Sequence, residues 1–188
     1  LQNQTTIANG YVGLGPFRSE FYLTPDPNSF DQGSIPWPDQ LALHEYRHVM
    51  QYNNFRNGLS KAFYYLFGEE GLLVAIDGTV PDWFFEGDAV YNETRLSTQG
   101  RGRLPFFFNG YKIMLQDSLH YNYMQLRNGS YKNYIPDHYQ LGYLFVLYGI
   151  EKYGNDFWKP ILQEASSLKT FSSKSRELCL GISASARF

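Results

Sequence analysis

The chain has 188 residues, which suits a single domain, and its formal net charge of −2 at pH 7 offers no basic surface. We therefore expect no nucleic-acid partner. No apolar run approaches the roughly 18 residues that a membrane span needs, so we expect no transmembrane segment in this chain. The only cysteine, Cys179, excludes an internal disulfide and a cysteine-held zinc, which leaves histidine and carboxylate side chains as ligands for any metal.

The first part of the chain, residues 1–37, is rich in Gly, Pro and Asn and predicts strands and loops. A short strand is expected at 20–24, where Pro25 closes it, and a weaker one at 5–12. Because the chain begins at Leu1 and stops soon after the start of a new helix at Ser183, we expect it to be a fragment of a longer protein.

Helical patterns dominate from Pro38 onward, and Pro is favoured in a first helical turn. The expected helices cover residues 38–53, 59–67, 69–76, 79–96, 105–115, 136–153, 156–166 and 172–180. A Gly/Arg-rich turn is expected at 100–103 and a polar connection at 117–135. The sequence thus predicts a mainly α (α+β) fold with a small N-terminal β-sheet.

The first of these helices carries the sequence His44-Glu45-Tyr46-Arg47-His48. Side chains four positions apart lie on the same face of a helix, so the two imidazoles can share one tetrahedral Zn²⁺ ion. Glu45 points about 100° around the helix from His44, where it can act as a general base without occupying the metal. An amphipathic helix with two surface histidines is the simpler alternative, but the apolar residues around the motif indicate a buried helix.

A catalytic zinc ion needs a third protein ligand and an open position. Two segments offer a carboxylate: Trp83-Phe84-Phe85-Glu86-Gly87-Asp88-Ala89, and Glu69-Glu70-Gly71. We favour Glu86, because a carboxylate among aromatic residues is costly unless it is paired or bound to a metal. Gly87 and Ala89 would let this helix approach the motif helix closely.

The paired motifs His44-Glu45-x-x-His48 and Trp83-x-x-Glu86-Gly87-x-Ala89 resemble those of the gluzincin metallopeptidases, the aminopeptidase-like peptidase MA group. The resemblance extends over roughly residues 39–181. It implies zinc-dependent hydrolysis of a peptide or protein substrate, with Glu86 as third ligand and Glu45 as base. Tyr139-Gln140-Leu141-Gly142 is similar to the family's Tyr-x-x-Gly, which implies that the Tyr139 hydroxyl binds the developing oxyanion. An extracytoplasmic, bacterial location is also implied.

Two features depart from the family. Residues 49–85 separate His48 from Glu86, a longer interval than in the aminopeptidases, so we expect an inserted helical hairpin within 54–80. No Gly-x-Met-x-Asn segment precedes the motif, which leaves endopeptidase and exopeptidase action both open. We thus expect one zincin-like domain over 1–188, with a strand-and-loop part at 1–37, zinc-binding helices at 38–98 and a helical lobe at 99–188.

Further candidates surround the motif. Glu93 lies two helical turns after Glu86 and is expected to hydrogen-bond a ligand histidine, with Asp88 and Asp39 as rivals. His138, beside Tyr139, is either an oxyanion donor or a surface residue, and His120 is expected to be solvated. The alternative to an enzyme is a non-catalytic zincin-fold module that serves binding or assembly in a larger surface protein.

Overall fold

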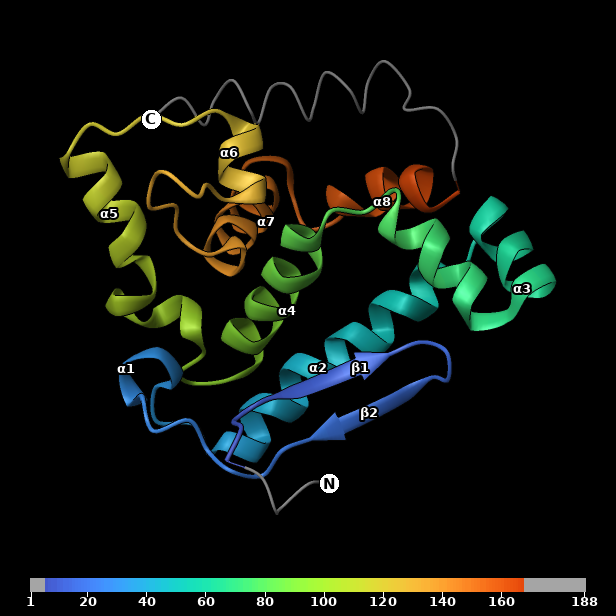
Figure 1. The fold of residues 1–188 in the computed structure, drawn as a ribbon, viewed down its shortest axis with the longest axis horizontal. Coiled ribbons are helices and arrows are strands. Elements are labelled where there is room, and N and C mark those ends of the chain that lie inside the picture. The colour runs from blue at the N-terminus through green and yellow to red at the C-terminus, as the bar shows by residue number, and fades with distance from the viewer. Residues whose placement is uncertain (1–5, 168–188) are drawn as a thin grey trace.

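A β-hairpin followed by a series of helices makes up residues 6–167, the part of the chain that the computed structural model describes (Figure 1). The expected mainly helical fold with a small N-terminal sheet is confirmed. The expected helix at 172–180 lies outside the described residues. The elements in chain order are β1 (Gly10–Gly13), β2 (Arg18–Phe21), α1 (Ser29–Gln32), α2 (Trp37–Phe55), α3 (Gly58–Asp77), α4 (Asp82–Leu96), the 3₁₀ helices η1 (Arg101–Arg103) and η2 (Pro105–Phe108), α5 (Asn109–Gln116), α6 (Tyr123–Asn128), α7 (His138–Tyr153) and α8 (Trp158–Ser166).

The hairpin pairs β1 with β2 in antiparallel register, Gly10 opposite Phe21 and Gly13 opposite Arg18. Both strands are displaced from the expected ranges, 5–12 and 20–24, because the tight turn between them fixes the register and the aromatic run alone does not. β1 lies close to α2. A Cβ atom at Gly10 would be 2.7 Å from Leu41 Cδ1, so this contact depends on glycine.

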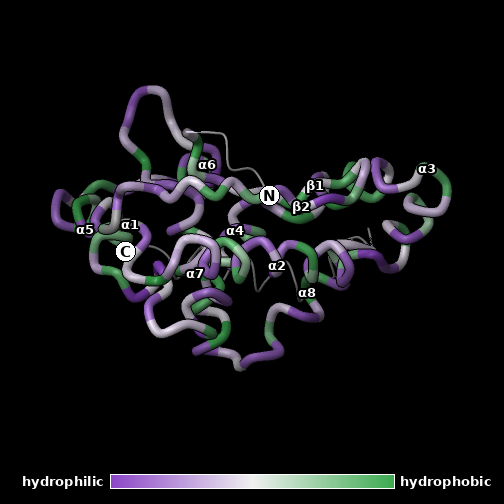
Figure 2. Tube along the Cα trace, turned by 90° about the horizontal axis from the view of Figure 1, so that it is seen from below, coloured by the Kyte–Doolittle hydropathy of each residue, from purple (hydrophilic) through white to green (hydrophobic). Residues whose placement is uncertain are grey.

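α2 is the motif helix, and it begins with Trp37 and Pro38 after Pro36. α3 starts at an Asn57–Ser60 capping box, and its chain direction breaks at Gly68, where φ is +69°. The two helical stretches expected at 59–67 and 69–76 are therefore the two arms of α3. The bend of α3 lies at one edge of the molecule (Figures 1 and 2). Hydrophobic side chains near this bend are exposed.

α4 lies between α2 and α7 and contacts both helices. It begins at Asp82 and not at Thr79, because the Thr79 hydroxyl donates to the carbonyl of Ala75 and so closes α3. Gly87 was expected to face α2, but it faces α7 instead. A Cβ atom at Gly87 would lie 2.0 Å from the carbonyl carbon of Gly142, so α4 and α7 touch backbone to backbone.

The core contains buried residues of α4, α7 and α8 together with residues of α2, α3 and α5, and many of its aromatic rings make edge-to-face contacts, such as Trp83 on Phe145. α6 forms where only a polar connection was expected, because Asn122 and Gln125 cap its first turn reciprocally. The helix expected at 105–115 is divided into η2 and α5. Among residues 6–167, none of the helices has the length and apolar character needed to cross a membrane.

Candidate metal centre

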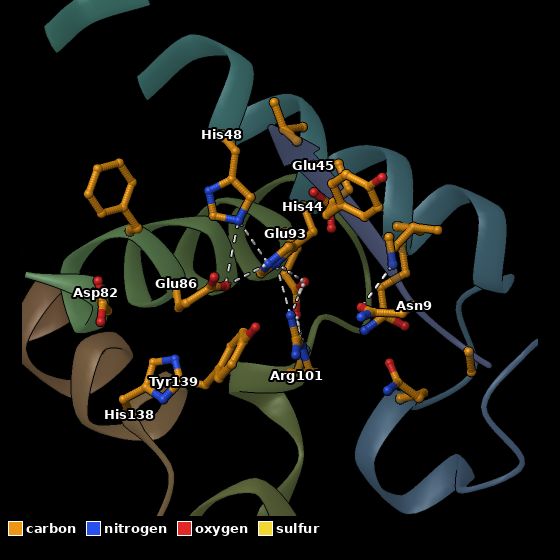
Figure 3. A pocket seen from close by; sticks show the side chains of 18 of the residues that line it. Asn9, His44, Glu45, His48, Asp82, Glu86, Glu93, Arg101, His138 and Tyr139 are labelled. Atoms are coloured by element: carbon orange, nitrogen blue, oxygen red, sulfur yellow. Dashed lines mark hydrogen bonds and ion pairs between the residues drawn. The ribbon is translucent and has the colours of Figure 1, made fainter. Parts of the chain in front are cut away.

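α2 and α4 bring His44, His48 and Glu86 together at the floor of a cleft (Figure 3). The Nε2 atom of His44 lies 3.0 Å from Glu86 Oε2 and 3.3 Å from the Nε2 atom of His48. The Nε2 atom of His48 lies 3.5 Å from the same carboxylate oxygen. Three ligand atoms from two helices thus form a nearly equilateral triangle.

This triangle has the dimensions of one face of a tetrahedral zinc site. Zn–N and Zn–O bonds of about 2.0–2.1 Å place tetrahedral ligands about 3.3 Å apart. Burial alone would raise the pKa of Glu86, but both histidines outweigh that effect and lower it below its usual range. Glu86 is therefore ionised at neutral pH, as a metal ligand must be. His44, His48 and Glu86 could hold a metal ion.

The second ring nitrogen of each histidine also has a partner. His44 Nδ1 lies 3.2 Å from Glu93 Oε2, and His48 Nδ1 lies 2.8 Å from Gln51 Oε1. When Nδ1 carries the proton and donates to these oxygens, the Nε2 lone pair of each ring is free to bind a cation. Glu93 is the residue that was expected to hydrogen-bond a ligand histidine, whereas the sequence analysis did not identify Gln51.

Gln51 connects the centre to a buried ion pair. Its Nε2 donates to Asp88 Oδ2 at 2.7 Å and to the carbonyl of Phe85 at 3.0 Å. Asp88 also accepts two hydrogen bonds from the Arg47 guanidinium, at 2.7 and 2.9 Å. Asp88 therefore contacts a ligand histidine only through Gln51, and its rival Asp39 is exposed in the first turn of α2. A polar residue three positions after His48 was the signal that could have identified Gln51.

Arg101, at the start of η1, is a second residue that the sequence did not reveal. Its Nε donates to Glu93 Oε1 at 2.7 Å and its Nη2 to Glu93 Oε2 at 3.1 Å. Burial alone would raise the pKa of Glu93, but Arg101 and His44 outweigh it and lower the pKa to about 2. Arg101 Nη2 also lies 2.9 Å from His44 Nδ1, to which it can donate only when Nδ1 is unprotonated. When Nδ1 carries the proton, the guanidinium and the imidazole both donate to the Glu93 carboxylate. The expected Gly/Arg-rich turn gave no signal of this contact.

Glu45 projects into the same space but belongs to no ion pair among the described residues. Its side chain is buried, and its Oε2 atom has no hydrogen-bond partner within residues 6–167. Burial raises the pKa of Glu45, and the adjacent His44 and His48 act in the opposite direction. A buried carboxylate oxygen without a partner, directly beside the metal triad, is suited to accept a proton from a bound molecule.

Tyr139 and His138 begin α7 on the other side of the centre. The hydroxyl of Tyr139 points toward Glu86 (Figure 3), and the ring centroids of Tyr139 and His44 are 6.1 Å apart. Burial, together with Glu86, raises the pKa of Tyr139, so its hydroxyl remains a proton donor at neutral pH. His138 is half-exposed, and its Nδ1 lies 3.0 Å from Asp137, so it lines the cleft without joining the triad.

The cleft above the triad has a volume of about 390 Å³. Residues of β1, α2, α4, η1 and α7 line it, with Asp82 and Asn9 on opposite sides of the triad (Figure 3). The alternative third ligands lie elsewhere. Glu69 accepts from the backbone N–H of Gly15 at 3.1 Å, and Glu70 is exposed beside it. His120 is exposed as well.

The chain matches no family model, no curated protein and no solved structure with which it was compared. The chemistry of the centre therefore rests on its own geometry. Two imidazoles and a carboxylate form a donor set for a divalent cation. Beside them lie a proton acceptor, Glu45, and a proton donor, Tyr139, and the open cleft gives access to both.

Proposed function

We propose that this chain is a zinc-dependent metallopeptidase of gluzincin type that hydrolyses peptide bonds. The observation that carries the proposal is the triangle of ligand atoms from His44, His48 and Glu86, with sides of 3.0, 3.3 and 3.5 Å. The donor set of two imidazoles and one carboxylate favours zinc over harder cations, which prefer oxygen ligands alone.

When bound in such a site, zinc supplies Lewis acidity, which lowers the pKa of water toward 7 and polarises a carbonyl group. Protein side chains are assigned the proton transfer and the stabilisation of the oxyanion. Glu45 accepts a proton from the attacking water and later delivers it to the leaving amine. Its Oε2 atom, which has no partner among the described residues, is free for this transfer.

Tyr139 is assigned the role of oxyanion donor. Its hydroxyl is protonated at neutral pH, because burial and Glu86 raise its pKa. As the substrate carbonyl oxygen gains negative charge, a hydroxyl that already points toward the centre stabilises the charge without reorganisation. The pattern Tyr139-x-x-Gly142 supports the same role through its resemblance to the gluzincins.

A peptide substrate agrees with the walls of the cleft. Residues 8–12, which include most of β1, form one wall, and β1 pairs only with β2 among the described elements. An extended peptide can bind beside a strand through main-chain hydrogen bonds. A peptide bound in this way has one of its backbone amides next to the metal triad on the floor of the cleft.

The alternative, a non-catalytic module with a structural metal, agrees less well with the site. A structural zinc site is closed by four protein ligands, whereas a catalytic one keeps a position open. Three ligands beside an open cleft favour catalysis, as does a buried Glu45 Oε2 atom that has no partner among residues 6–167.

The test is cleavage of a peptide library by the zinc-loaded protein, analysed by mass spectrometry. The unaltered chain should cleave, and both Glu45→Gln and prior treatment with a chelator should abolish cleavage. Cleavage that survives Glu45→Gln would show that the base is misassigned. A zinc-loaded chain that cleaves nothing would favour the non-catalytic module.

A further inference from the structure

Gln40 carries a buried amide oxygen that no side chain or backbone group of residues 6–167 satisfies. It lies on α2 one helical turn before His44, and 2% of the residue is exposed. Its Oε1 atom is buried without a hydrogen-bond partner among residues 6–167. Buried polar groups are nearly always hydrogen-bonded, so this oxygen is expected to have a partner, which residues 6–167 do not supply.

The position of Gln40 shows where that partner would come from. Gln40 lines the same cleft as His44 and Glu45. Positions 40, 44 and 48 follow one face of α2, so the amide lies beside the metal triad on the side of the helix N-terminus. A methionine of similar length would fill this position without any polar group to satisfy, so packing alone does not explain the glutamine.

A second amide lines the same cleft. Asn9, just before β1, lies on the opposite side of the triad from Asp82 (Figure 3). The Asn9 Oδ1 atom accepts from the backbone N–H of Gly10 at 2.9 Å. Asn9 and Gln40 thus add uncharged amides to the lining of the cleft, whereas the acidic side chains of Asp77 and Asp82 line it between the end of α3 and the start of α4.

We propose that Gln40 determines substrate specificity, and that its amide hydrogen-bonds a neutral polar side chain of the substrate, Asn, Gln, Ser or Thr, next to the cleaved bond. The inference rests on the proposed peptidase function for the substrate class. An amide is both donor and acceptor and carries no charge, so it satisfies a carboxamide or a hydroxyl. Apolar side chains leave it unsatisfied, and ionised ones bring a charge that it cannot neutralise.

The experiment exchanges the amide for groups of similar size. Gln40→Met removes the hydrogen bonds, and Gln40→Glu replaces the amide with a carboxylate. Both are made in zinc-loaded Glu45→Gln protein, which binds peptides without consuming them. Binding of capped peptide pools that differ in one residue class (neutral polar, apolar, basic or acidic) is measured by calorimetry. Gln116→Met, an exposed glutamine on α5, is the matched control.

With Gln40 present, the neutral polar pool should bind most tightly, and Gln116→Met should leave this order unchanged. Gln40→Met should weaken that pool about five- to tenfold and strengthen the apolar pool, while Gln40→Glu should favour the basic pool. The same order of pools in all variants would overturn the inference, and so would failure of every pool to bind. Should neither Gln40 variant fold, the order of pools for the protein with Gln40 still decides, because an apolar or charged preference contradicts the assignment.

The proposed function is tested separately, by cleavage with the unaltered chain. Cleavage together with Gln40-independent binding would overturn the specificity assignment alone. Gln40-dependent binding without cleavage would overturn the peptidase assignment alone. A thermal melt adds an independent readout, because removing an unsatisfied buried amide should leave Gln40→Met at least as stable as the unaltered protein.

Discussion

His44 Nε2 lies 3.0 Å from Glu86 Oε2, although the two residues are 42 positions apart in the sequence. The contact exists because α4 packs against α2 on one side and against α7 on the other. The metal triad is therefore a property of helix packing, and changes in that packing should affect it as much as changes in the ligands.

Glu45→Gln should separate metal binding from catalysis. The substitution keeps the size of the side chain but removes the proton acceptor, so turnover should fall by about 10²–10⁴-fold while the metal content stays unchanged. Peptide cleavage and elemental analysis on the same preparation measure the two effects. A variant that loses its metal would identify Glu45 as a ligand instead.

Tyr139→Phe should lower turnover and leave zinc binding and the fold intact. Loss of one donor to a developing oxyanion costs about 10²–10³-fold in turnover, and little change is expected in KM. Tyr131→Phe is the control, because Tyr131 is fully exposed. Equal turnover in the two variants would remove Tyr139 from the catalytic set.

Arg101→Met should weaken both the fold and the metal centre. Glu93 is fully buried, and Arg101 supplies its charge partner at 2.7 Å. Removing one member of a buried pair costs about 3–5 kcal/mol of unfolding free energy. Because Glu93 also orients His44, zinc affinity should fall about 10–100-fold.

Arg95→Met is the matched control for this prediction, since Arg95 lies on α4 with its side chain exposed. Denaturant unfolding and competition with a chelator measure stability and affinity. An Arg101→Met protein as stable as the control would show that the Glu93–Arg101 pair does not support the centre.

Gly142→Ala should disrupt the crossing of α4 and α7. A Cβ atom at this position would lie 1.8 Å from the carbonyl oxygen of Trp83, which no rotamer change can relieve. We expect the unfolding free energy to fall by at least about 1–3 kcal/mol. Zinc binding should also weaken, because α4 must shift. Gly78→Ala, where the nearest atom is 3.4 Å away, should have a small effect. Similar melting temperatures for the two variants would contradict this packing.

The parts of the site that sequence reasoning could predict are those set by local periodicity. His44, Glu45 and His48 share one helix, and Glu86 lies in a helix with a recognisable aromatic pattern. Glu93 follows from the same periodicity. These residues required no knowledge of how the helices cross.

The remainder depends on contacts between distant segments. Arg101 reaches Glu93 from a 3₁₀ turn whose direction is fixed by packing and not by composition. The orientation of Gly87 toward α7, contrary to expectation, likewise depends on which neighbour α4 meets. In the sequence Gln40 is an ordinary polar residue near a helix start, and only the burial of its Oε1 atom without a partner among residues 6–167 distinguishes it.

The most direct test of the metal centre is elemental analysis of the protein after removal of metal by a chelator and reloading with zinc. Glu86→Ala is compared with Glu70→Ala, which removes an exposed glutamate that competed as third ligand in the sequence. We predict about one zinc ion per chain in the unaltered protein and in Glu70→Ala, and loss of zinc in Glu86→Ala. An unaltered chain that binds no zinc, or a Glu86→Ala variant that binds it equally well, would contradict the assignment.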